Sequence, residues 1–135
     1  MEYNILLLNI HRDYFNQNVN YGDFAGLHQI AAFLGRNGFE SRVFGGDIYE
    51  GWERIQYFCD NQNDGIVGLY CDFENVVDIM KICKMIKSRY NVSVIVGGPQ
   101  TTALGEQFLK ESGCAAIVRG EGELTMLELA QCFLD

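Results

Sequence analysis

Short apolar segments of strand length alternate along the chain with longer segments in which apolar residues recur at helical spacing. The first of the short segments, NILLLNI at 4–10, is apolar almost throughout, which is typical of a strand covered on both faces. We expect strands at 4–10, 39–45, 65–70, 92–96 and 115–118. We expect helices that include the apolar faces within 24–34, 52–59 and 76–86, and further helices over 102–112 and 121–134.

This alternation amounts to a fivefold repeat of strand and helix. Because connections between parallel strands are almost always right-handed, it predicts a parallel sheet with helices on both faces. The expected fold class is α/β: a three-layer, doubly wound, flavodoxin-like (Rossmann-like) domain with strand order 2-1-3-4-5. The 135 residues suffice for one domain, 1–135, and the last predicted helix reaches the final residue. We interpret the chain as a fragment of a longer one, with a short complete protein as the alternative.

The composition excludes several classes of partner. Eighteen acidic and ten basic residues give a net charge of −8, which argues against a nucleic-acid or anionic-membrane surface. No apolar run approaches the roughly 20 residues needed to span a bilayer, and the N-terminus has no basic region of the kind found in signal peptides. The five cysteines form no CxxC or CxxxCxxC pair. The sequence therefore predicts a cytoplasmic protein without a disulfide framework, and no zinc or iron–sulfur site built from this chain alone.

A ligand of such a sheet is expected beyond the carboxyl ends of the strands, near the switch in strand order. Gly97 and Gly98 follow the fourth predicted strand, and together they leave a strand end without side chains. A flat group could then lie against the backbone, and Gly68 on the neighbouring strand would extend the same bare surface. The alternative is that glycine only supplies a positive φ for the turn.

The usual phosphate-binding patterns are absent from the sequence. No GxGxxG follows the first strand, and no loop ends in Gly-Lys-Ser/Thr. GEGE at 120–123 carries two carboxylates, which suit a helix start and repel phosphate. A phosphorelay receiver shares the fold, and Asp13 and Asp72 could stand for its acids, but Arg119 lies near the position of its lysine. A flavin carrier would need a run of Ser/Thr in the first loop, where HRDYFNQN has none.

Two motifs at the carboxyl edge carry a family resemblance. The stretches GGPQTTAL (97–104) and AAIVRGEGELTMLEL (115–129) resemble the N-terminal cobalamin (vitamin B12)-binding domain of radical S-adenosylmethionine (SAM) enzymes, a family that includes the magnesium-protoporphyrin IX monomethyl ester cyclases. In that family the fourth strand runs into Gly-Gly-Pro-His-Ala/Thr and the fifth into Arg-Gly-Glu-Gly-Glu. The stretch GLHQIAAFLGRNGFESRVF (26–44) is similar to the family's first helix and second strand, so the resemblance covers nearly the whole chain.

The resemblance implies that the domain binds cobalamin, with the nucleotide tail in a slot beside the sheet and the corrin over the carboxyl edge. The slot would be lined by Gly68, Leu69, Tyr70, Cys71, Gly97 and Gly98, and the residues facing the tail or the corrin rim would be Pro99, Gln100 and Thr101. Gln100 stands where many members have histidine. A C-terminal radical SAM domain, absent from this chain, would hold a 4Fe-4S cluster and cleave SAM for methyl transfer or ring formation. The chain alone would have no turnover.

The first loop departs from the cobalamin-ligating motif Asp-x-His-x-x-Gly of mutases and methionine synthases. Asp13 is kept, but Phe15 replaces the histidine and Asn18 the glycine. Because phenylalanine has no lone pair to donate, we expect base-off cobalamin with no protein nitrogen on the cobalt. His11 is the alternative ligand. An apolar floor under the corrin would be formed by Tyr14, Phe15 and Tyr21, or these side chains would instead pack on the first helix or against a missing domain.

The remaining candidates have a structural alternative beside the functional one. Arg119, Gly120 and Glu121 are expected near the cofactor, although Arg119 could instead pair locally and Glu121 could favour a first helical turn. Cys71 would contact the cofactor or be a buried structural thiol. His28 is expected to be a packing or surface residue. The competing function is a flavodoxin-like regulatory or interaction module that has lost its cofactor.

Overall fold

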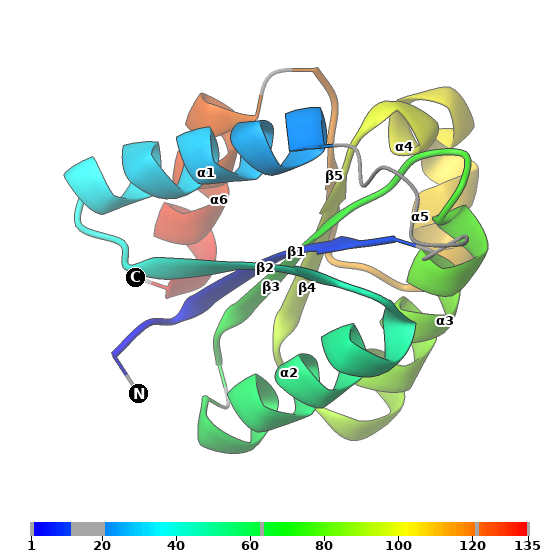
Figure 1. Cartoon of the computed structure of the whole chain (residues 1–135), viewed down its shortest axis with the longest axis horizontal. Helices are drawn as coiled ribbons and strands as arrows, with labels where there is room; N and C mark the ends of the chain where they lie inside the picture. Colours follow the sequence, from blue (N-terminus) through cyan, green and yellow to red (C-terminus); the bar gives the residue numbers. More distant parts are fainter. Residues whose placement is uncertain (1, 12–20, 63, 121, 135) are drawn as a thin grey trace.

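The computed structural model describes residues 2–11, 21–62, 64–120 and 122–134, and it contains a sheet of five parallel strands in the order β2-β1-β3-β4-β5 (Figure 1). The strands are β1 (Ile5–Ile10), β2 (Ser41–Gly46), β3 (Ile66–Tyr70), β4 (Ser93–Gly97) and β5 (Ala116–Val118). All four neighbouring pairs are parallel. The predicted fold class and strand order are confirmed.

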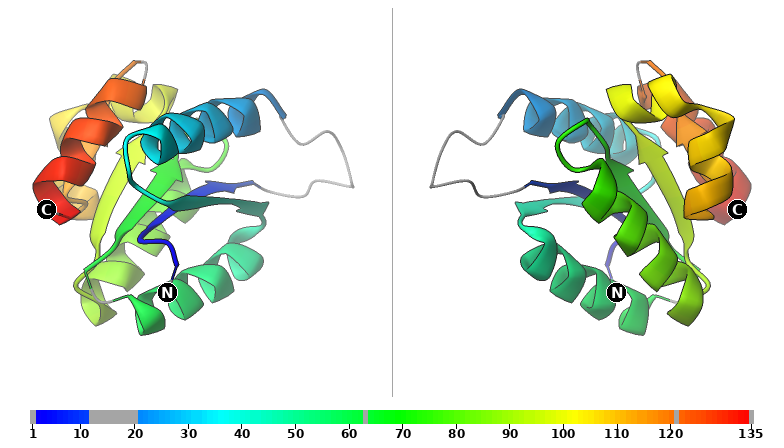
Figure 2. Two further views of the ribbon diagram at one scale, coloured as in Figure 1. Left: turned by 90° about the vertical axis from the view of Figure 1, so that its left-hand side faces the viewer. Right: turned by 90° about the vertical axis from the view of Figure 1, so that its right-hand side faces the viewer.

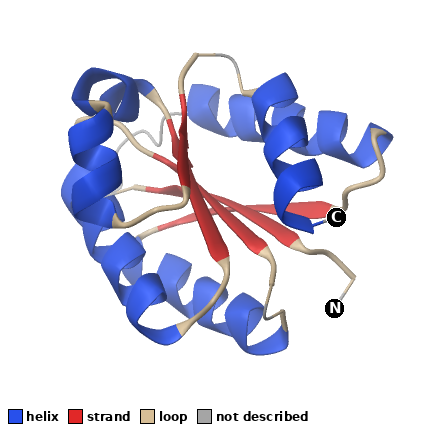
Figure 3. Cartoon of the chain, turned by 180° about the vertical axis from the view of Figure 1, so that it is seen from behind, coloured by secondary structure: helices blue, strands red, loops and turns tan. Residues whose placement is uncertain are grey.

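Helices cover both faces of the sheet, which gives the three layers seen in Figures 1 and 3. One face is covered by α1 (Tyr21–Arg36) and α6 (Glu123–Leu134), which lie next to each other in Figure 2. The other face is covered by α2 (Ile48–Asn61), α3 (Val76–Arg89) and α5 (Glu106–Ser112). Among the described helices, none has the length and apolar character that a membrane crossing requires.

The central strand β1 divides the core into two layers. All six of its residues are buried, and its side chains alternate between the faces. Leu6 and Leu8 pack in the layer under α2 and α3, whereas Ile5 and Leu7 pack in the layer under α1 and α6. Each buried aliphatic side chain of this kind stabilises the fold by about 1.5–3 kcal/mol, so β1 anchors both layers.

The helix α2 begins at a local capping signal in the sequence. The Asp47 side chain accepts a hydrogen bond from the Glu50 N–H at 2.9 Å, and the Glu50 side chain accepts one from the Asp47 N–H at 3.3 Å. This capping box satisfies two N–H groups that a helix start leaves without partners. It fixes the point at which the chain leaves the edge strand β2.

The helix expected over 102–112 differs in the structure, where it is two helices and begins earlier. The first is α4 (Pro99–Leu104), and α5 follows after Gly105. Proline is well suited to the first helical position because its φ is preset and its missing N–H would have no partner there. Gly105 has φ 57° and ψ −131°, which interrupts the helical path. Residues 99–101, which precede the predicted helix, are therefore part of a short helix at the carboxyl edge.

Candidate functional site

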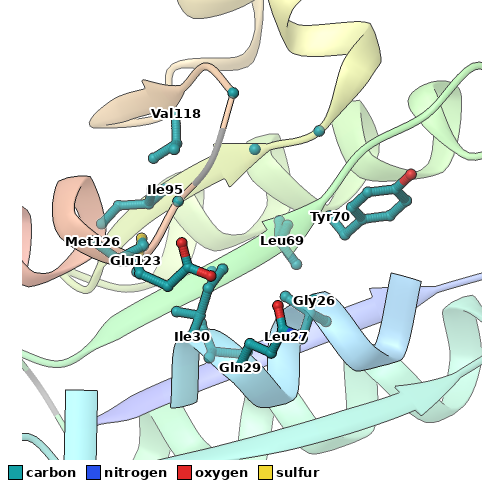
Figure 4. A pocket seen from close by; sticks show the side chains of 16 residues that line it. Gly26, Leu27, Gln29, Ile30, Leu69, Tyr70, Ile95, Val118, Glu123 and Met126 are labelled. Atoms are coloured by element: carbon teal, nitrogen blue, oxygen red, sulfur yellow. The ribbon is translucent and has the colours of Figure 1, made fainter. Parts of the chain in front are cut away.

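A cavity of about 290 Å³ lies between α1, α6 and the carboxyl ends of the central strands (Figure 4). Most of its wall is apolar, with side chains such as Leu27, Ile30 and Met126 from the two helices. Six of the residues that line it are glycines: Gly26, Gly68, Gly97, Gly98, Gly120 and Gly122. The cavity sits where the topology of a doubly wound sheet places ligands.

Gly97 forms part of the cavity floor and places no side chain in the cavity. It lies two residues after Ile95, which lines the cavity, and therefore on the same face of β4. A Cβ atom on Gly97 would lie 3.6 Å from Val118 Cβ, an ordinary contact distance. A Cβ atom at this position would thus meet no clash, and it would lie on the cavity face of β4.

Gly68, on the neighbouring strand β3, also faces the cavity, but its small size has a second cause. A Cβ atom there would come within 2.7 Å of Leu7 Cδ2, so the missing side chain makes room for Leu7 in the core. The bare surface expected from Gly68 and Gly97 is present in the structure. For Gly68, packing alone would also account for the glycine.

Gly98 serves a different purpose from Gly97. Its φ is 114°, a value that residues with a side chain rarely adopt, and a Cβ atom would overlap the carbonyl oxygen of Cys71. The segment that follows β3 is joined here to the segment that follows β4. The hydrogen bonds run from Cys71 N to Gly97 O at 2.7 Å and from Gln100 N to Cys71 O at 3.3 Å. The structural alternative from the sequence, a turn that needs glycine, therefore applies to Gly98.

Asn75 ties the carboxyl ends of β1 and β3 together. Its side-chain N–H groups donate to the carbonyl oxygens of Ile10 at 2.7 Å and Tyr70 at 2.9 Å, and its side-chain oxygen accepts from Asp72 N at 2.8 Å. Asp72 in turn accepts from the N–H of Asn75 at 3.0 Å and of Glu74 at 2.9 Å. Asp72, which could have matched a receiver acid, thus holds the turn after β3.

The predicted residues at the end of β3 divide between the two faces of the sheet. Tyr70 packs on the cavity face, whereas Leu69 and Cys71 pack in the layer under α2 and α3. Leu69 still contributes to the cavity wall, but Cys71 is fully buried and does not. Burial, and to a smaller extent the nearby Asp72 charge, raises the pKa of the Cys71 thiol to about 12. The thiol is therefore protonated at neutral pH, which agrees with the structural alternative.

The other predicted residues surround the cavity mouth or lie further along the carboxyl edge. Pro99, Gln100 and Thr101 form the start of α4, outside the cavity wall, and Thr101 is buried with its hydroxyl donating to Gly98 O at 2.7 Å. Gly120 lines the cavity. The predicted site residues Asp13, Tyr14, Phe15 and Glu121 lie outside the described residues.

His11, Arg119 and His28 lie outside the cavity wall. His11 is half-buried directly after β1, and its backbone N–H donates to Gly46 O at 3.0 Å. Arg119 is exposed, and its guanidinium lies against Gly105, where a Cβ atom would be 3.0 Å from Nη2. His28 is exposed on α1.

Sequence reasoning missed the contribution of the two helices to the site. Gln29 and Glu123 line the cavity from α1 and α6, together with Gly26 and Gly122. The signal was available in part, because Gly26 and Gln29 are three residues apart and so share a helix face, and Glu123 ends the Arg-Gly-Glu-Gly-Glu motif. What was missing was the knowledge that α1 and α6 flank the same face of the sheet.

The described residues do not assemble a metal site, and their buried thiols are held in the protonated form. No group of three or more His, Cys, Asp or Glu side chains in that part of the chain could hold a metal ion. Burial raises the pKa of the Cys59 thiol to about 12 and also raises the pKa of Cys83 and Cys114. These groups are poor nucleophiles at neutral pH. The described site is suited to binding a flat, largely apolar group.

Comparison with known proteins identifies a family. The family model for the B12 binding domain matches residues 19–130. An uncharacterized methyltransferase of Pyrococcus horikoshii is 41% identical over 66 residues, which cover 47% of this chain and 14% of the methyltransferase. This chain thus spans a small part of that relative.

Two solved structures share the fold. The radical SAM methyltransferase TsrM of Kitasatospora setae, solved with tryptophan substrate and a SAM analogue, has a TM-score of 0.77 and 17% identity over 97% of this chain and 26% of TsrM. A cobalamin-binding protein of Desulfitobacterium hafniense has a TM-score of 0.70 and 16% identity over 99% of this chain and 60% of that protein. At these identities the likeness is one of fold.

Proposed function

The chain belongs to the B12 binding domain family, and we propose that it binds cobalamin as the N-terminal module of a radical SAM methyltransferase or cyclase. The observation that carries the proposal is the glycine-lined cavity at the carboxyl edge, with Gly97 as its open floor.

The cavity fits one part of this cofactor. Binding sites for whole small molecules usually measure about 300–1,000 Å³, so a cavity of about 290 Å³ has room for a flat bicyclic base and its sugar but not for a corrin ring. Leu27, Ile30 and Met126 would contact the faces and edges of the base, and Gly68 and Gly97 would let it approach the backbone. Filling the cavity excludes water from these apolar walls, which favours binding.

The carboxyl edge beyond the cavity is proposed to face the corrin. Pro99, Gln100, Thr101, Arg119 and Gly120 lie along or near this edge, and His11 stands at the end of β1. We include Asp13, Tyr14, Phe15 and Glu121 in this proposal on the strength of the family resemblance. When bound, cobalamin supplies a cobalt centre that can carry a methyl group between donor and acceptor.

The parent protein is proposed to be larger than this chain. The support is that the chain covers 26% of TsrM and 14% of the Pyrococcus methyltransferase. The 4Fe-4S cluster and SAM would belong to a C-terminal radical SAM domain, the proposed partner of this one.

A cytoplasmic location is supported by the cysteines, all of which are free among the described residues. The alternative function, a flavodoxin-like module that has lost its cofactor, is separated from this proposal by a binding measurement.

The test of cobalamin binding uses Gly97→Val. The wild-type chain is expected to bind cobalamin in an absorbance titration or equilibrium dialysis. In the variant the valine side chain occupies part of the cavity, so the ligand must fit into less space. Overpacking of this kind costs about 1–3 kcal/mol, and the same loss of binding free energy would raise the Kd by about 5- to 150-fold. Circular dichroism should show an unchanged fold, because a Cβ atom at Gly97 meets no clash.

Gly35→Val is the matched control for this test. A Cβ atom on Gly35 has no neighbour within 4 Å, and Gly35 is not part of the cavity wall. The control should bind as tightly as the wild type. Equal affinity of the wild type and Gly97→Val would contradict the proposed place of binding, and a wild-type chain that does not bind cobalamin would favour the module without cofactor.

A second expectation concerns the axial ligand of the cobalt. We propose that cobalamin is held base-off with no protein nitrogen ligand, because Phe15 stands where related proteins carry a histidine and imidazole is the usual neutral ligand in proteins. Electron paramagnetic resonance of the cobalt(II) form bound to the chain should show no nitrogen superhyperfine splitting, and His11→Ala should leave the spectrum unchanged. Splitting that is lost in His11→Ala would identify His11 as the ligand, and splitting that persists would show that the base stays on the cobalt.

A further inference from the structure

Two polar side chains point into the otherwise apolar cavity. Glu123, half-buried at the start of α6, and Gln29, exposed on α1, approach it from these two neighbouring helices (Figure 4). Among the residues that the structure describes, neither side chain has a hydrogen-bond or ion-pair partner. Apart from Gln29 and Tyr70, the rest of the lining consists of glycines and apolar side chains, and Ile30 lies next to Glu123 in Figure 4.

This arrangement sets a condition on what can fill the cavity. An empty cavity leaves the carboxylate of Glu123 in contact with water. A ligand that displaces this water without offering a hydrogen-bond donor leaves a charged group desolvated and unpaired, which opposes binding. A ligand with a flat apolar part and a donor beside it satisfies both the aliphatic walls and the carboxylate. Sites of this kind take their specificity from a few such polar groups in an apolar wall.

We propose that Glu123, with Gln29 opposite it, recognises a hydrogen-bond donor on the nucleotide tail of a cobamide, and so selects complete cobamides over those that lack the nucleotide. The inference rests on the proposed function and deepens it. Two donors have the right chemistry: a hydroxyl of the ribose, which every complete cobamide carries, and the amino group of a purine base. The dimethylbenzimidazole of cobalamin has no N–H or O–H of its own, so in cobalamin the ribose must supply the donor.

A purely structural role for Glu123 makes a different prediction. A carboxylate in the first turn of a helix is favourable because of the helix dipole, whether or not it meets a ligand. Glu123→Asp keeps the charge in the first turn of α6 but withdraws the carboxylate by one methylene from the cavity. Glu123→Leu removes the acceptor altogether. If Glu123 only stabilises the helix, Glu123→Asp should behave as the wild type in every binding assay.

The experiment compares the dissociation constants of three probes: cobalamin, a cobamide with adenine as lower base, and cobinamide, which lacks the nucleotide. The full chain is titrated at about 0.15 M salt, where charges further apart than about 8 Å are largely screened. Losing a hydrogen bond to a charged group should raise the Kd of Glu123→Leu for cobalamin by about tenfold or more, with a smaller rise for Glu123→Asp. The Kd for cobinamide should stay within about twofold of the wild type, which is within the range of surface substitutions.

Gln29→Leu and Glu128→Leu complete the set. Gln29→Leu should weaken cobalamin binding less than Glu123→Leu, because a neutral group is lost. Glu128 is exposed on the same helix α6 and does not line the cavity, so Glu128→Leu should change none of the three constants. Thermal unfolding of each variant confirms that the comparisons are made on folded chains.

The adenine cobamide separates the two sources of the donor. If the purine amino group is recognised, the wild type binds this cobamide more tightly than cobalamin, and Glu123→Leu abolishes the difference. If the ribose is recognised, Glu123→Leu weakens the binding of cobalamin and of the adenine cobamide by the same factor. An equal effect on the cobamides and on cobinamide, or no effect of Glu123→Leu on either cobamide, overturns the inference while the proposed function stands. A wild-type chain that binds no cobalamin refutes the proposed function and this inference with it.

Discussion

Gly98→Ala is expected to destabilise the domain strongly, whereas Gly97→Ala is expected to leave its stability almost unchanged. At Gly98 the φ of 114° disfavours any side chain, and a Cβ atom would overlap the backbone of Cys71, whose nitrogen would be only 3.0 Å away. Left-handed backbone strain and overpacking together cost about 2–5 kcal/mol. Domains of this size are usually stable by about 5–15 kcal/mol, so the loss is a large share of the total.

The neighbouring glycine is the natural control. A Cβ atom on Gly97 would make only ordinary contacts with Val118 at 3.6 Å, and alanine in a strand is favoured over glycine by about 0.5–1 kcal/mol. Urea unfolding followed by circular dichroism should therefore show a much lower midpoint for Gly98→Ala and a midpoint near that of the wild type for Gly97→Ala. Similar midpoints for the two variants would show that the turn at Gly98 tolerates a side chain.

This contrast separates two roles within one sequence motif. Gly98 shapes the turn by which the chain leaves β4 and enters α4, and Gly97 keeps the floor of the cavity open. The sequence alone could not distinguish them, because both roles call for glycine. The distinction depends on where the missing Cβ would point, and that follows from the approach of Cys71 from the neighbouring segment.

The fold could be predicted because several local signals agree. Strand-length apolar runs and helix-period segments alternate five times, and the right-handed crossover rule leaves few ways to arrange them. The helix at 102–112 was placed less well, since proline can either end a loop or begin a helix, and Gly105 can be either a break or a tolerated residue. For such residues, the tertiary contacts of the segment determine where the helix begins and where it is interrupted.

The site could be predicted where it lies on the strand ends and not where it lies on the helices. Gly68, Leu69, Tyr70, Gly97, Gly98 and Gly120, which the sequence placed near the ligand, line the cavity. Cys71 does not, because its side chain is fully buried in the core layer under α2 and α3. Gln29 and Glu123 were missed because the packing of α1 beside α6 joins segments that are about ninety residues apart in the sequence.

The role of Asn75 also depends on contacts between distant parts of the sequence. Its replacement by leucine is expected to be among the most destabilising changes in the domain. Asn75 is 2% exposed, and its side chain binds Ile10 O, Tyr70 O and Asp72 N at once. One of these bonds spans 65 residues of sequence, so local patterns do not reveal it. Each buried polar group left without a partner costs about 1–3 kcal/mol, so losing three partners should lower the free energy of unfolding by about 3 kcal/mol or more.

Two further variants distinguish this clamp from an ordinary hydrogen bond. Asn61→Leu removes a single exposed bond, from the Asn61 side chain to Tyr57 O at 2.8 Å, and should cost about 1 kcal/mol or less. Asn75→Asp keeps an acceptor for Asp72 N but loses both donors, so it too should be strongly destabilising. Urea unfolding of the three variants gives the comparison. If Asn75→Leu costs no more than Asn61→Leu, water must replace the lost bonds. The ends of β1 and β3 would then be held by the strand pairing alone, and the cavity floor would not depend on the Asn75 side chain.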